Sequence, residues 1–152
     1  MRKHKKKTIF LLVLAVALII GVIVSQINYE KIAKEGFATI GIPEMHHSYV
    51  NKVTNSHESL ISFAFSATAK KDVVKAMNTT GKWAKKPVSD VADAAMLDSF
   101  WSDKDAYPLF SEIPKNSKIE SGKWRLDKDK SGFLYSVFDL ENCKLYIYRY
   151  TK

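Results

Sequence analysis

The chain has 152 residues, a formal net charge of +8 and a single cysteine, so an intrachain disulfide is excluded and a folded domain must be stabilised by its apolar core. Five of the 24 basic residues precede position 8, and the remainder of the chain has nineteen basic against sixteen acidic residues. The charge excess beyond this short tail is small and does not imply a nucleic-acid partner.

Residues 1–7, MRKHKKK, are expected to form a cytoplasmic basic tail, and residues 8–27 a transmembrane signal-anchor helix. The run from Ile9 to Val24 has no polar side chain. A helix over 8–27 would span about 30 Å, the thickness of the hydrocarbon core of a bilayer. Because positive charge is retained on the cytoplasmic side, the chain from about residue 28 onward is expected outside the cell membrane.

A cleaved signal peptide is the alternative to this anchor. The sequence Ala15-Val16-Ala17 has the small-x-small pattern of a cleavage site. Cutting there would leave an apolar N-terminus, and cutting after Ser25 would put Ile23 where a small residue is preferred. The length of the apolar run and these poor cleavage sites favour an uncleaved anchor.

Residues 28–47 are expected to form a stalk or connector. One interpretation continues the anchor as a helix to Lys34, with Gly36 as its stop signal. The other is a flexible stalk. An extracytoplasmic domain would then occupy residues 48–152.

The domain is expected to have two strands, then two helices, then three strands, so that strands and helices form separate runs. Ile61, Phe63 and Phe65 alternate with the small residues Ser62, Ala64 and Ser66, which is typical of a strand with one apolar face. The expected strands are 48–54, 60–66, 118–126, 133–138 and 144–150, and the expected helices are 69–79 and 91–101. This order predicts an α+β fold, a small antiparallel sheet with two helices packed on one face.

The segment from Asp127 to Leu134, DKDKSGFL, resembles the first eight positions of an EF-hand calcium loop. That resemblance implies Asp127, Asp129 and Ser131 as calcium ligands. The twelfth position is Phe138, where the family has a bidentate glutamate, and strands flank the segment instead of helices. The same residue types are typical of an exposed hairpin turn, so a plain turn is favoured and calcium is the alternative.

Tyrosines gather on one face of the last strand. Tyr146, Tyr148 and Tyr150 alternate with Leu145, Ile147 and Arg149, and Trp83 stands in a basic linker over 82–87. Tyrosine and tryptophan suit protein interfaces because each combines an apolar ring with a polar tip. These four aromatic residues are the predicted partner surface, and burial of the tyrosines under the helices is the alternative.

Other reactive side chains lack a recognisable constellation. His46 and His47 are adjacent and would point to opposite faces of a strand, while His57 lacks the spacing of a zinc site. Cys143 has no neighbouring general base in the sequence. We therefore expect no catalytic residues and no cofactor.

The sequence thus favours a non-enzymatic, membrane-anchored extracytoplasmic domain that binds a protein or cell-envelope component, in the manner of an accessory, inhibitor or immunity-like protein. A secreted binding protein released by signal-peptide cleavage, with or without calcium, is the second hypothesis. An enzyme of unknown class is the third.

Overall fold

A computed structural model describes the backbone of residues 2–85, 88 and 90–152, and the side chains of 13–85, 88, 90–115 and 117–152. The chain divides into two compact units, Met1–Lys31 and Ile32–Lys152. The helices are α1 (Arg2–Ile40), α2 (Lys70–Thr79) and α3 (Val91–Ser102), with short 3-10 helices η1 (Phe110–Glu112) and η2 (Asn116–Lys118). The strands are β1 (Tyr49–Thr54), β2 (Glu58–Ala64), β3 (Ala84–Lys85), β4 (Gly122–Asp129), β5 (Gly132–Asp139) and β6 (Lys144–Thr151).

The first unit consists of the N-terminal part of α1. Its large apolar side chains between Val13 and Val24 are exposed by 49 to 64%. Within the described residues, Val13–Ile40 is the segment that is long and apolar enough to cross a membrane, a criterion that anchors and signal sequences both meet. The predicted N-terminal apolar helix is confirmed, while the side chains of the basic tail and of residues 8–12 lie outside the described ones.

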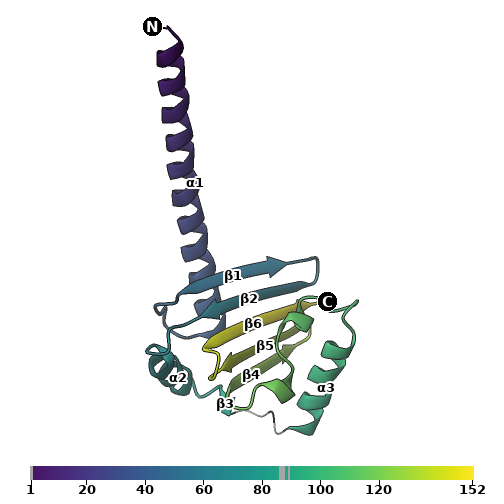
Figure 1. Ribbon diagram of the computed structural model, residues 1–152. Coiled ribbons are helices and arrows are strands. Elements are labelled where there is room, and N and C mark those ends of the chain that lie inside the picture. The colour runs from purple at the N-terminus through teal and green to yellow at the C-terminus, as the bar shows by residue number, and fades with distance from the viewer. Residues whose placement is uncertain (1, 86–87, 89) are drawn as a thin grey trace. The chain divides into compact units, whose positions relative to one another are not determined.

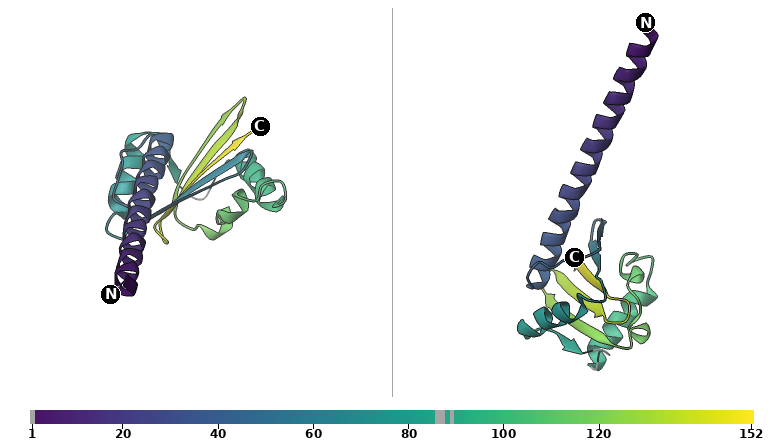
Figure 2. Two further views of the ribbon diagram at one scale, coloured as in Figure 1. Left: turned by 90° about the horizontal axis from the view of Figure 1, so that it is seen from above. Right: turned by 60° about the vertical axis from the view of Figure 1, so that its left-hand side comes forward.

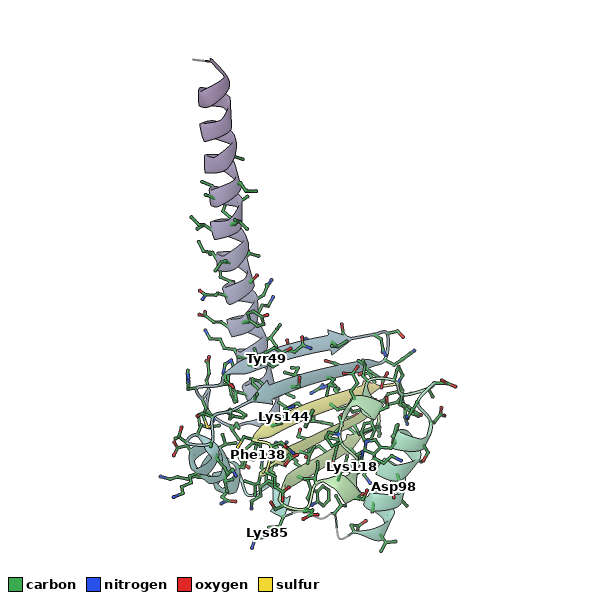
Figure 3. All side chains as sticks on the ribbon, in the orientation of Figure 1. Tyr49, Lys85, Asp98, Lys118, Phe138 and Lys144 are labelled. Atoms are coloured by element: carbon green, nitrogen blue, oxygen red, sulfur yellow. The ribbon has the colours of Figure 1, made fainter. Side chains whose placement is uncertain are left out.

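The second unit contains a six-stranded sheet in the order β1-β2-β6-β5-β4-β3, with every neighbouring pair antiparallel (Figure 1). Tyr49 lies at the β1 edge and Lys85 at the β3 edge (Figure 3). The five expected strands and two expected helices are present, so the predicted α+β class is confirmed. The short strand β3 was not expected, because it falls in the segment interpreted as a basic linker, of which residues 86 and 87 are outside the described ones.

The two faces of the sheet have separate apolar cores. The end of α1 and helix α2 pack with Leu145 and Ile147 of β6. Helix α3 and η1 pack with Tyr135 and Tyr148 on the other face. The left view of Figure 2 shows α2 and α3 on opposite sides of the sheet. The expectation that both helices share one face is therefore wrong, because β6 alternates between two sets of large side chains and each set must be buried.

Helix α1 continues through Gly36 and ends at Ile40, followed by Gly41 in the left-handed region at φ 67°. The expected stop at Gly36 is wrong. A Cβ atom at position 36 would lie 2.6 Å from Cζ of Phe63, so glycine is there to let the helix approach the sheet closely. Ala33, Phe37 and Ile40 are fully buried, and the compact unit thus begins at Ile32, within the segment expected to be a stalk.

Substitution Gly36→Ala tests this close approach. Alanine has the higher helix propensity by about 1 kcal/mol, but overpacking against Phe63 costs about 1–3 kcal/mol, so the expected net loss is about 0–2 kcal/mol of unfolding free energy. Urea unfolding of the full chain in detergent measures it. The double variant Gly36→Ala, Phe63→Leu should recover part of the loss, and Gly21→Ala, with no atom within 4 Å of the new Cβ, is the matched control. A stabilised Gly36→Ala variant would contradict the packing argument.

Candidate functional site

Two adjoining hollows lie on the sheet face that carries the end of α1. Their volumes are about 460 and 360 Å³, and Thr39, Arg149 and Thr151 line both. We call the combined depression the Arg149 groove. Strand register explains its position, because residues of five strands form one row across this face, namely Thr54, Ser59, Arg149, Leu134 and Asp127.

The groove exists because the last turns of α1 cover the neighbouring row and stop there. Gly36 packs against Phe63 and Ile61, and the carbonyl oxygen of Ile40 accepts a 2.8 Å hydrogen bond from Nη1 of Arg125 on β4. This hydrogen bond ties the end of the helix across the sheet. The row that contains Arg149 lies two residues further along the strands, and its members Thr54 and Arg149 are exposed.

Most charged groups beside the groove are already paired. Lys52 contacts Glu35 at 2.6 Å, and Arg125 contacts Asp127 at 2.5 Å. Arg149 is exposed and takes part in no ion pair of the described residues. A guanidinium in this state presents donors that match a carboxylate or phosphate in a bidentate arrangement.

Asp129 is an acidic group that lines the same hollow as Arg149. Hydrogen bonds from the hydroxyl and the backbone N–H of Ser131 lower the pKa of Asp129, and the charge of Arg149 lowers it further. The carboxylate therefore stays ionised and contributes negative charge at the β4 end of the groove. Apolar side chains of Ile61, Ile147 and Leu134 line the same depression, so the groove combines an apolar floor with a polar rim.

The residues of the predicted calcium loop form the turn between β4 and β5. The carboxylate of Asp129 accepts hydrogen bonds of 2.6 and 2.7 Å from the hydroxyl and N–H of Ser131, and Asp127 pairs with Arg125. Both carboxylates thus have partners within the chain. In the described part of the chain, no three His, Cys, Asp or Glu side chains converge in the manner of a metal site. Calcium binding at Asp127, Asp129 and Ser131 stays a prediction.

The predicted aromatic partner surface lies mostly inside the molecule. Tyr148 is fully buried and Trp83 is 8% exposed, so neither is available to a partner. Tyr146 and Tyr150 are half-buried, and Tyr150 packs against Tyr107 and Phe133. The face of β6 that carries the tyrosines is therefore a core, as the alternative interpretation held, and the Arg149 face is the one that remains partly open.

The histidines and the cysteine are dispersed among separate elements. The ring of His47 packs edge-on to Phe63, and Nδ1 of His57 lies 3.2 Å from the carbonyl oxygen of Thr151. Cys143 is buried in the turn before β6 with φ 51°. None of these groups is placed beside Arg149 except His57, which lines one end of the groove.

Sequence reasoning missed a buried carboxylate at the start of β2. Glu58 is 3% exposed, and its carboxylate accepts hydrogen bonds from the Tyr148 hydroxyl at 2.8 Å and the Asn55 amide at 2.6 Å. The backbone N–H groups of Phe110 and Leu109 donate to it at 3.3 and 3.5 Å. Glu58 thereby joins β2, β6 and η1. In the sequence it follows a run of turn residues, which gives no sign that it is buried.

No family model, curated protein or solved structure matches this chain. Its function is therefore inferred from the geometry and charge of the groove.

Substitution Tyr148→Phe should destabilise the domain by about 1.5–3 kcal/mol, because it removes a hydrogen bond to a buried carboxylate. Tyr146→Phe, on the same face of the same strand but half-buried, is the matched control and should change the unfolding free energy by less than about 0.5 kcal/mol. Denaturant unfolding of both variants measures the difference. Equal effects of the two substitutions would show that the Glu58 contact contributes little.

The buried tyrosines also predict a loss of stability in alkali. Burial raises the pKa of Tyr148, its hydrogen bond to Glu58 raises it further, and burial raises the pKa of Tyr135. In the unfolded chain both phenols lose their protons near pH 10, whereas in the folded chain they keep them. The unfolded state then binds fewer protons, so the unfolding free energy is unaffected below that pH and falls as the pH rises above about 10.

Urea titrations at a series of alkaline pH values measure this dependence. Tyr148→Phe should show a shallower decline than the parent chain, and Tyr146→Phe should stay closer to the parent. A decline of the same slope in the Tyr148→Phe variant would exclude Tyr148 as a source of the effect.

Proposed function

We propose that this protein is a single-pass membrane protein whose domain lies outside the cytoplasm and binds a protein or cell-envelope partner in the Arg149 groove, without catalysing a reaction. The exposed apolar helix and the five basic residues ahead of position 8 support the anchor and its orientation. The compact unit that follows supports a folded domain that is presented by this anchor.

The observation that carries the binding function is the unpaired guanidinium of Arg149 in an open depression of the sheet. Paired surface charges are satisfied by their neighbours, but Arg149 is left to solvent between two hollows with an apolar floor. Ligand sites typically combine such a concave apolar floor with a few polar groups that fix the orientation of the ligand. The combined volume of the hollows lies within the range of such sites.

A secreted form of the same binding domain is the alternative, favoured by the small-x-small sequence at Ala15–Ala17. Cleavage would change where the domain acts but would leave the groove unchanged, because the residues that line it all lie after position 34.

Site-specific photo-crosslinking in the native host tests the proposed binding surface. A photoreactive amino acid at Thr54 or Thr151, both exposed at the groove, should form discrete adducts on illumination of intact cells. The matched control places it at Asp98, exposed on α3 at the opposite face of the sheet (Figure 3).

Adducts at the two groove positions and none at Asp98 would support the proposal. No adduct at the groove, or the same adducts from all three positions, would refute it. The mass of the recovered chain distinguishes the two forms, because an anchored protein from washed membranes retains its N-terminal residues and a secreted one lacks them.

A further inference from the structure

We infer that the Arg149 groove recognises an extended peptide segment through a carboxylate placed opposite Arg149. This inference rests on the proposed function and specifies the chemistry of the ligand. It depends on three features of the described residues, which are the length of the depression, the unpaired cation at its centre and the ionised Asp129 at one end.

The dimensions of the groove suit an extended chain. Its lining runs from Thr54 on β1 across β2, β6 and β5 to Asp127 on β4, which is four inter-strand spacings. At about 4.8 Å each, these spacings cover roughly 19 Å, and an extended peptide of about six residues has that length. Three hydroxyl groups along this path can donate to peptide carbonyls or accept from peptide N–H groups, namely those of Thr54, Ser59 and Thr151. The hydroxyls of Thr39 and Ser131 donate to Glu35 and Asp129 and can accept from a peptide N–H.

The charges favour one carboxylate over a polyanion. Arg149 lies on β6, the middle strand of this path, so an acidic group at the centre of the peptide meets a free guanidinium. At the β4 end Arg125 pairs with Asp127 and Lys128 with Asp93, so the ionised Asp129 and Lys82 are the charged groups of that end without an ion pair among the described residues. A nucleic acid or an anionic lipid surface would bring a further negative charge against Asp129, whereas a peptide with a single central acid places its charge at Arg149 alone.

Arg149 can be changed without loss of the fold. Its side chain is exposed and makes no ion pair within the described residues, so substitutions there should alter the unfolding free energy by less than about 0.5 kcal/mol. The variants Arg149→Gln and Arg149→Lys remove the charge and the bidentate geometry, respectively. Asp129→Asn removes the competing negative charge, and Lys75→Gln, on the exposed side of α2, is the matched control for loss of one positive charge.

The test uses the full chain in nanodiscs of neutral phosphatidylcholine and a library of random eight-residue peptides. The library is presented in two formats, with a free C-terminal carboxylate and with a C-terminal amide. The selected peptides should contain one Asp or Glu near the middle in both formats. Selection in the acid format alone, of peptides without an internal acid, would assign recognition to the C-terminus and contradict the central carboxylate.

A selected peptide, resynthesised, should bind the Arg149→Gln variant at least about tenfold more weakly, because a charge-assisted bidentate contact is lost. Arg149→Lys should fall between this variant and the parent chain, Asp129→Asn should bind more tightly, and Lys75→Gln should match the parent. Circular dichroism and urea unfolding of each variant confirm the fold.

Selected peptides without an excess of acidic groups, or equal binding by Arg149→Gln, would overturn the inference. Binding of the full chain in its neutral nanodiscs to phosphatidylglycerol vesicles would also overturn it, if that binding requires Arg149 and the selected peptides do not compete with it. If groove adducts form in cells and yet the selected peptides show no charge preference, the proposed function stands and this inference fails. If the groove yields neither adducts nor peptides, both fail.

Discussion

The central strands of this domain carry apolar side chains on both faces, and this property determines how the rest of the chain must pack. On β6, Leu145 and Ile147 point to one face, and Tyr148 points to the other. Both faces must be covered to remove this surface from water. The chain does so with different elements, the end of α1 and α2 on one face and α3 with η1 on the other. The C-terminal end of the N-terminal helix is therefore a structural part of the domain.

The Arg149 groove is a consequence of how far that cover extends. Gly36 lets α1 approach Phe63, and the hydrogen bond from Arg125 to the carbonyl of Ile40 ties the end of the helix to β4. The strands continue beyond this point, and Thr54, Arg149 and Thr151 are exposed there. An apolar floor next to a polar rim arises there because the same strands pass from the buried region to the open one.

On the opposite face, the buried carboxylate of Glu58 adds a polar contact to the apolar core. Removing the carboxylate of Glu58 from water costs several kcal/mol, which is offset by four donors from Tyr148, Asn55 and the backbone of η1. Phe110 of η1 lies 52 residues after Glu58 in the sequence, and Tyr148 lies 90 residues after it. The contact therefore specifies how the long connector after α3 docks on the sheet.

Local patterns in the sequence determined the apolar N-terminal helix, the period-two strands and the α+β class, because each depends on residues close together in the chain. They did not determine which strand lies beside which. The register of β2 against β6 decides that Ser59 lies opposite Arg149, and only the tertiary structure places Glu58 beside Tyr148. Gly36 shows the same limit, since a helix stop and a close helix–sheet contact both favour glycine, and the neighbouring Phe63 distinguishes them. The groove could not be predicted for this reason: its residues come from α1 and five strands, and alternation along one strand does not reveal where a helix from elsewhere in the chain will end.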